Sequence, residues 1–362
     1  MRIAILGTRG IPARYGGFET FAEELSRRLV SRGHMVSVYC REPYEQSSYL
    51  GVRRRELPTI RHKYLDTLVH TGLSTLHLLF RRRMDVVLYC NAANAIYCWL
   101  PRLLGMPVAL NVDGLERHRR KWNALAKAWY ALSERLATFC PSAIVTDAAA
   151  IKKYYLDEYN TYSIMIPYGA EPAPVATTAV LDELKLERDR YVLYVSRLEP
   201  ENNALLVRES FEKLRTDFQL ALIGDAPYAA EYIARVRNTR DPRVVMPGAI
   251  YGAGYAELQS HCYCYVHATE VGGTHPALIE AMGRGALVLY LDTPENAEVA
   301  GGAGLAFTAA TLPAVLEQAL ALPPAERRQW QERAVDRVRT RYSWESVTTQ
   351  YENLFRQLVE RP

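Results

Sequence analysis

Short runs of apolar residues, many of them β-branched, alternate along the chain with longer segments in which apolar positions recur at a helical period. This alternation is typical of parallel β-sheets covered by helices. In the first part of the chain it predicts strands near residues 3–8, 36–40, 86–91, 108–112, 143–146 and 163–167. It predicts helices near residues 17–32, 66–80, 95–103, 121–138 and 147–156. We therefore expect a doubly wound α/β domain.

A second series of the same kind follows. Its strands are expected near residues 191–196, 219–224, 244–246, 262–267, 286–290 and 305–307. Its helices are expected near residues 203–214, 229–237, 276–282 and 312–321. Residues 170–187 begin with many Ala, Pro and Thr residues and are interpreted as a linker. A chain of 362 residues is too long for one ordinary core, so two Rossmann-like domains are predicted.

Composition places the chain among soluble globular proteins, with 49% hydrophobic and 23% charged residues. The first apolar run, Ile3–Leu6, is short and ends at Gly7, and no later run is long enough to span a bilayer, so we expect a cytoplasmic protein. The six cysteines lie mostly in apolar runs without a CxxC pair. This favours buried thiols over disulfides or a zinc site.

The charge is distributed unevenly. Residues 1–165 carry 24 Lys and Arg residues against 14 Asp and Glu residues, whereas the remainder is acidic. Basic clusters at 53–55, 61–63, 81–83 and 117–121 lie near the aromatic residues Tyr64, Phe80, Trp99 and Trp122. This pattern favours docking of the first domain on an anionic membrane surface, on the inner face of the plasma membrane. A solvated basic surface is the alternative. No nucleic-acid partner is expected.

The stretch 271–299 is expected to form a loop, a helix, a strand and a second loop. Gly272 and Gly273 allow close approach of the backbone to a ligand, and Thr274 or His275 can cap the helix. Free amides at a helix start, together with the helix dipole, are suited to binding a phosphate. The loop is therefore a candidate anion site. Alternatively, it is only a glycine turn before a capped helix.

Glu280 would lie one turn beyond this helix start. A carboxylate there is a poor phosphate ligand but a good acceptor for the sugar hydroxyls of a nucleotide. The alternative is a surface pair between Glu280 and Arg284.

A glycine-rich loop also follows the first predicted strand. It contains Arg9, Arg14, Gly16 and Gly17 and leads into a helix. The loop lacks the GxGxxG spacing of a dinucleotide site, and no acidic residue closes the second strand, which weighs against NAD. It could also be no more than a tight turn between strand and helix.

Three further polar residues follow predicted strands. Asp113 and Glu116 could act as a general base, or could be a turn residue and a helix-start residue. Arg197 is a candidate cation for a diphosphate, and its alternative is an ordinary surface arginine.

Three segments carry a resemblance to a known family. Leu6–Thr20, Ser196–Asn203 and Val271–Met282 resemble the motifs of family 4 glycosyltransferases of the GT-B fold, in particular a subgroup described as rhamnosyltransferases. Two positions depart from the broad family pattern. Asn202 stands where a phosphate-binding Lys is common, and Gly272 stands where the first Glu of the E-x7-E pair is expected, with Glu270 out of register. Arg9 or Arg14 would then contribute more to charge stabilisation.

The resemblance implies two facing Rossmann-like domains with a central cleft, an acceptor-side domain at 1–169 and a nucleotide-sugar domain at 170–341. A segment at about 342–362 would cross back onto the first domain, or form a plain surface helix. The resemblance implies a retaining, metal-independent transferase without a cofactor. It would move L-rhamnose from dTDP-rhamnose to a glycan or lipid-linked saccharide in bacterial cell-surface polysaccharide synthesis. The alternatives are a UDP- or GDP-sugar donor, a sugar-nucleotide epimerase, or a non-catalytic sugar-nucleotide-binding protein.

Overall fold

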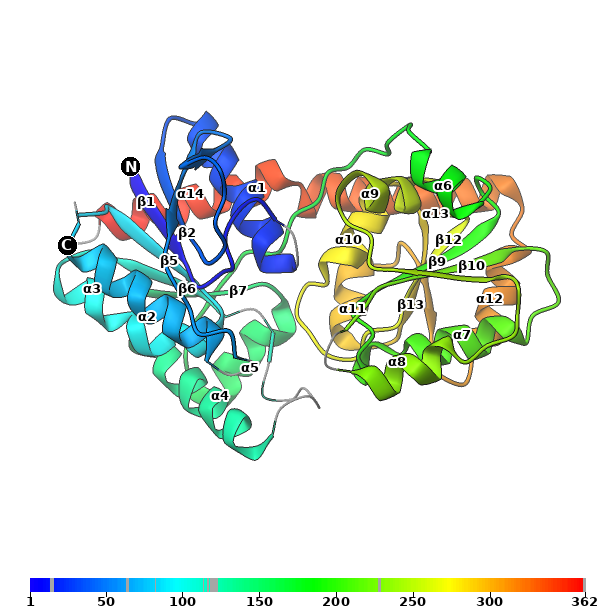
Figure 1. The fold of residues 1–362 in the computed structure, drawn as a ribbon, viewed down its shortest axis with the longest axis horizontal. Helices are drawn as coiled ribbons and strands as arrows, with labels where there is room; N and C mark the ends of the chain where they lie inside the picture. Colours follow the sequence, from blue (N-terminus) through cyan, green and yellow to red (C-terminus); the bar gives the residue numbers. More distant parts are fainter. Residues whose placement is uncertain are drawn as a thin grey trace. The chain divides into compact units, whose positions relative to one another are not determined.

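A computed structural model describes residues 1–13, 16–62, 65–81, 83–112, 114–115, 117, 123–226 and 229–360. The chain divides into two compact units (Figure 1). The N-terminal unit consists of Met1–Tyr168 and Trp344–Pro362, and the C-terminal unit consists of Gly169–Ser343. Each unit contains its own sheet, and the two are described separately.

The N-terminal unit has a sheet in the order β3-β4-β2-β1-β5-β6-β7-β8 among the described residues, parallel except between β3 and β4. Its strands are β1 (Arg2–Leu6), β2 (Met35–Cys40), β3 (Ser48–Tyr49), β4 (Val52–Glu56), β5 (Val86–Cys90), β6 (Val108–Asn111), β7 (Ala143–Thr146) and β8 (Ile164–Met165). The chain first builds outward from β1 and then crosses to β5 on its other side. The strand order therefore reverses between β1 and β5, and ligands of such sheets bind beyond the carboxyl ends of the strands at this switch point.

Helices cover both faces of this sheet. One layer comprises α2 (Asp66–Leu79), η1 (Ala92–Tyr97), α3 (Trp99–Leu103), α4 (Ala124–Ala137) and α5 (Ala149–Tyr159). Its apolar core includes Leu78, Ala137 and Tyr155 against Val108 and Leu110 of β6. The other layer comprises α1 (Gly17–Ser31) and α14 (Trp344–Glu360), which pack together. Because successive strand residues point to opposite faces, one apolar run serves both layers.

The C-terminal helix α14 belongs to the N-terminal unit. The ring of Tyr351 lies 5.3 Å from that of Phe21 on α1, and its hydroxyl accepts a 2.8 Å hydrogen bond from Asn111. Arg32 pairs with Glu345 at 2.7 Å and with Glu352 at 2.9 Å. The segment is therefore anchored by aromatic packing and by ion pairs.

The C-terminal unit has a parallel sheet in the order β11-β10-β9-β12-β13-β14 among the described residues. Its strands are β9 (Tyr191–Val195), β10 (Gln219–Ile223), β11 (Val244–Gly248), β12 (Cys264–His267), β13 (Leu287–Leu291) and β14 (Leu305–Phe307). Its helical segments are α6 (Ala179–Leu184), η3 (Pro200–Asn202), α7 (Ala204–Glu212), α8 (Ala230–Arg237), α9 (Gly252–His261), α10 (Pro276–Gly283), α11 (Pro294–Ala300), α12 (Leu312–Leu320), α13 (Pro324–Arg337) and the π-helical η4 (Val338–Tyr342). Here the strand order reverses between β9 and β12, which places the second switch point.

The predicted α/β fold class is confirmed, and all six cysteines are buried free thiols, as expected. Several elements were not predicted. The linker expected at 170–187 contains α6, and the arginine cluster at 53–55 lies in β4. Helix α13 was not predicted because it has no apolar stripe. Ala334 is its only buried residue. None of the helices in the described part of the chain is long and apolar enough to cross a membrane.

Candidate functional site

The loop after β9 presents Arg197 at the switch point of the C-terminal unit. The side chain of Arg197 is exposed, and its Nη1 lies 3.7 Å from Oε1 of Glu199. Its carbonyl accepts 2.7 Å hydrogen bonds from the Glu199 amide and from the side-chain amide of Asn202. Asn202 is buried. The residue that replaces the expected Lys therefore holds the turn that carries Arg197.

The loop after β9 is bonded to the loop after β12. Asn203 adopts a left-handed conformation with φ of 60°. Its side-chain amide donates to the carbonyl of Ala268 at 2.9 Å and to Oε1 of Glu270 at 3.0 Å. The Glu270 amide in turn donates to the carbonyl of Glu201 at 3.0 Å. Glu270, which is out of register with the family motif, thus joins the two loops of the switch point.

Gly272 leaves space for an imidazole ring. A Cβ at this position would lie 2.3 Å from Cε1 of His275, too close for any side chain. His275 is buried at the N-cap position of α10, and its ring centroid lies 4.7 Å from that of His267 on β12. Its side chain makes no capping hydrogen bond, contrary to one of the expected uses of this residue. Burial, reinforced by His275, holds the pKa of His267 well below its ordinary value, so the His267 imidazole is neutral.

Glu280 of α10 is held by α9, a helix that the sequence did not predict. The hydroxyl of Tyr255 donates to Oε2 of Glu280 at 2.8 Å. The amide of Gln259 donates to the Tyr255 oxygen at 2.7 Å and to the carbonyl of Ala277 at 3.2 Å. Arg284 donates to the carbonyl of Ala173 at 2.5 Å, whereas the alternative interpretation paired it with Glu280. The carboxylate therefore has a fixed orientation one turn into α10.

The glycine-rich loop after β1 lies at the switch point of the N-terminal unit. Gly10 has a φ of +109°, and a Cβ there would lie 2.6 Å from Cβ of Cys40, so only glycine fits. The Arg9 amide donates to Oε1 of Glu19 at 2.9 Å, and the Ala13 amide donates to Glu23 at 2.7 Å. Two carboxylates of α1 therefore bind backbone amides of this loop.

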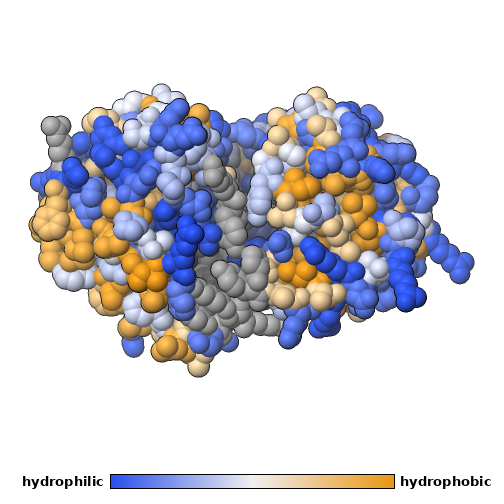
Figure 2. Space-filling model, viewed as in Figure 1, coloured by the Kyte–Doolittle hydropathy of each residue, from blue (hydrophilic) through white to orange (hydrophobic). Residues whose placement is uncertain are grey.

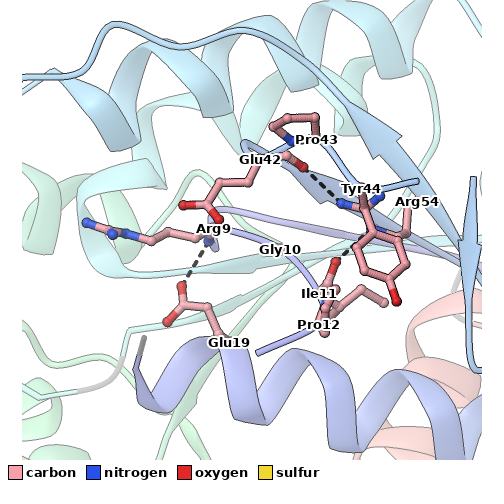
Figure 3. Close-up of a pocket in the computed structure, with 9 residues that line it drawn as sticks. All are labelled: Arg9, Gly10, Ile11, Pro12, Glu19, Glu42, Pro43, Tyr44 and Arg54. Carbon is pink, nitrogen blue, oxygen red and sulfur yellow. Dashed lines mark hydrogen bonds between the residues drawn. The ribbon is translucent and has the colours of Figure 1, made fainter. Parts of the chain in front are cut away.

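Arg54 of β4 supports the same loop from the other side. Its Nε donates to the carbonyl of Ile11 at 2.7 Å, and Nη2 donates to the carbonyl of Glu42 at 2.9 Å. Figure 3 shows the ring of Tyr44 beside this guanidinium, with a centroid distance of 4.7 Å. These residues line a pocket together with Arg9 and Glu19. Arg54 is only 4% exposed, so this member of the arginine cluster is structural and not part of a solvated surface.

The predicted site residues thus fall on two switch points. Arg197, Gly272, Gly273, Thr274, His275 and Glu280 belong to the C-terminal unit, and Arg9, Gly16 and Gly17 belong to the N-terminal unit. Gly16 is the N-cap of α1, and Gly17 is its first residue. Asp113, Glu116 and Arg14 lie outside the described residues. The roles of all these residues in donor binding or catalysis remain predictions.

Comparisons with known proteins agree with this arrangement. Residues 16–168 match the model of a glycosyl transferase 4-like domain, and residues 189–322 match that of glycosyl transferases group 1. No curated protein matches the sequence significantly.

The fold resembles those of solved structures over almost the whole chain. Sucrose-phosphate synthase from Thermosynechococcus elongatus is 20% identical, with 99% of this chain and 98% of that chain covered and a TM-score of 0.82. Anabaena Alr3699/HepE in complex with UDP and glucose is 13% identical, with 98% of each chain covered and a TM-score of 0.79. WaaG, a glycosyltransferase involved in lipopolysaccharide biosynthesis, is 18% identical, with 98% and 99% covered and a TM-score of 0.73.

The two units therefore have the GT-B fold. The two glycosyltransferase domain models match in consecutive order along the chain and together support a family 4 glycosyltransferase of the GT-B type.

Proposed function

We propose that this chain is a retaining rhamnosyltransferase. It takes L-rhamnose from dTDP-rhamnose and transfers it to a glycan or lipid-linked saccharide in bacterial cell-surface polysaccharide synthesis. The main support for a donor site is the hydrogen bonding between the loop after β9 and the loop after β12, at the switch point of the C-terminal unit. One loop carries Arg197, and the other leads into the helix of Glu280. The resemblance of the motifs supports the choice of dTDP-rhamnose.

In this proposal the protein supplies positioning and charge stabilisation rather than a nucleophile. The bond between the anomeric carbon and the phosphate oxygen breaks while the acceptor oxygen bonds to the same face of that carbon. The acceptor proton passes to the leaving phosphate. Arg197 and the amides at the start of α10 stabilise the charge of the diphosphate. Glu280 accepts a hydrogen bond from a hydroxyl group on the pentose of the nucleotide.

A UDP-sugar donor is the second candidate. It is favoured by the similarity of the fold to that of Anabaena Alr3699/HepE, which was solved with UDP and glucose. A ribose also offers Glu280 two neighbouring hydroxyl groups, whereas deoxyribose offers one.

Thermal shift assays with dTDP, UDP and GDP test the donor site. A ligand at about 100 times its dissociation constant should stabilise the protein by roughly 2.7 kcal/mol. We expect dTDP to give the largest shift and the Arg197→Ala variant to lose it. Arg240→Ala, which removes an exposed arginine of the same unit, is the matched control. A largest shift with UDP would favour the second candidate, and an unchanged dTDP shift in Arg197→Ala would reject the site.

Turnover tests the rest of the proposal. Arg197→Ala should slow transfer by about a hundredfold, by analogy with the loss of one preorganised donor to a developing negative charge. The product should keep the anomeric configuration of the donor, as read by NMR. Transfer should also persist in the presence of a chelator, since arginine and helix amides take the place of a divalent ion. Loss of transfer on chelation, with recovery in magnesium or manganese, would reject the metal-independent mechanism.

A further inference from the structure

Helix α2 has its polar residues inside and its apolar residues outside. The buried side chains of α2 are His70, Thr71, Ser74, Thr75 and Leu78. On the outer side, Leu73 is 38% exposed, Leu76 is 51% exposed and Phe80 at the C-cap is 88% exposed. Their spacing of three and four residues places them on one stripe. A surface helix normally has the opposite arrangement, so the outer stripe of α2 fits an apolar environment better than water.

The apolar stripe continues onto the neighbouring helices. Trp99 and Leu103 of α3 and Phe139 after α4 are exposed. Arg83 joins the ends of α2 and α3 because its guanidinium donates to the carbonyl of Gly105 at 2.6 Å. Arg102 joins α3 to α4 by donating to the carbonyl of Phe139 at 2.7 Å. Figure 2 shows apolar residues gathered over α2 and α3. We call Leu73, Leu76, Phe80, Trp99, Leu103 and Phe139 the α2–α3 apolar surface.

Among the described residues 65–140, the strongly exposed charged side chains are basic. Arg81, Arg83 and Arg102 are exposed at its edge. The acidic side chains described in this range are buried or only partly exposed. Asp66 pairs with Arg41, Asp85 pairs with Arg2, and Glu134 is buried. The surface is therefore apolar and cationic together.

We propose that the α2–α3 apolar surface docks this enzyme on the anionic leaflet of a membrane. Leucine and aromatic side chains fit the boundary between headgroups and acyl chains, and the arginines fit anionic lipid. A second copy of the chain is a poorer occupant, because a two-fold interface would bring together two surfaces that are both edged by arginines. The inference extends the proposed function, in which the acceptor can be lipid-linked. Its evidence comes only from a surface of the N-terminal unit.

Vesicle co-sedimentation of the full chain tests this inference without using transfer. We expect binding to vesicles that contain phosphatidylglycerol, weaker binding at high salt, and little binding to phosphatidylcholine alone. Trp99 should report the contact as a blue shift of fluorescence, which Trp99→Phe removes. Phe80→Ser combined with Leu103→Ser should lower partitioning by at least about tenfold, and Arg81→Gln should lower it only at low salt.

Two controls keep the outcomes separate. Tyr162→Ser removes a ring that is 83% exposed elsewhere on the same unit and should bind vesicles as the wild type does. The thermal shift with dTDP should be unchanged in the Phe80/Leu103 variant, so failure of docking is distinguishable from failure of the donor site. Normal vesicle binding by the double variant would overturn the proposal. A concentration-dependent dimer in light scattering that this variant abolishes would also overturn it, in favour of self-association.

Discussion

The hydroxyl of Tyr255 donates a 2.8 Å hydrogen bond to Oε2 of Glu280, across 25 residues of sequence. Gln259 donates to the same hydroxyl from the next turn of α9. Glu280 is the proposed acceptor for the sugar hydroxyls of the nucleotide. Tyr255 therefore uses part of the hydrogen-bonding capacity of this carboxylate before any nucleotide binds, and less remains for the two hydroxyl groups of a ribose.

The first prediction concerns donor selectivity. Tyr255→Phe should shift the ratio of dissociation constants in favour of UDP over dTDP by about tenfold or more, the effect of one hydrogen bond to a charged group. Isothermal titration with both nucleotides measures this ratio. Tyr251→Phe, at the N-cap of the same helix, is the control. A ratio that stays constant while both affinities fall would assign Tyr255 a structural role only.

The second prediction concerns the contact between Gly272 and His275. Gly272→Ala should destabilise the protein by about 1–3 kcal/mol, because the new methyl group must displace a buried ring. His275→Ala removes that ring. The double variant should therefore lose less free energy of unfolding than the two single variants lose together. Calorimetric unfolding of all three variants measures the coupling. Strictly additive losses would contradict the contact.

The third prediction concerns acid stability. Hydrogen bonds from Arg356, together with those from His34 and Arg32, lower the pKa of Glu352 to about 2 from its ordinary value of 4.5. As pH falls, the unfolded chain therefore takes up the proton first. The stabilisation by Glu352 is present above pH 4.5 and is lost as pH falls toward 2.

The measurement is the free energy of unfolding between pH 6 and pH 2. Glu352→Gln should make its dependence on pH shallower in this window. Glu360→Gln, at the exposed end of the same helix, should leave the wild-type slope. Equal slopes in all three proteins would show that Glu352 does not anchor α14.

The parts of the site that could be predicted from sequence are those with local signals. Arg197 follows an apolar run, and Gly272 precedes a proline-started helix, so both were placed at strand and helix ends. Tyr255 could not be found in this way. Its helix contains Gly252 and Gly254, which weaken the helical signal, and its bond to Glu280 arises only when α9 packs beside α10. The sequence shows only that Asn202 stands where a Lys is expected, because its hydrogen bond to the Arg197 carbonyl depends on the folded turn.

The last prediction separates two neighbouring arginines that the sequence does not distinguish. Arg54 is 4% exposed and donates to the carbonyls of Ile11 and Glu42, whereas Arg53 is exposed on the other face of β4. Arg54→Ala removes the guanidinium donor from the buried carbonyl of Ile11, from the carbonyl of Glu42 and from the carboxylate of Glu56. It should destabilise the protein by about 2–4 kcal/mol, and Arg53→Ala by no more than about 0.5 kcal/mol. Denaturant unfolding measures both. The glycine-rich loop should also become more open in Arg54→Ala, seen as faster amide exchange at Ile11 and Ala13. Similar small losses in both variants would mean that the loop after β1 is held by the carboxylates of α1 alone.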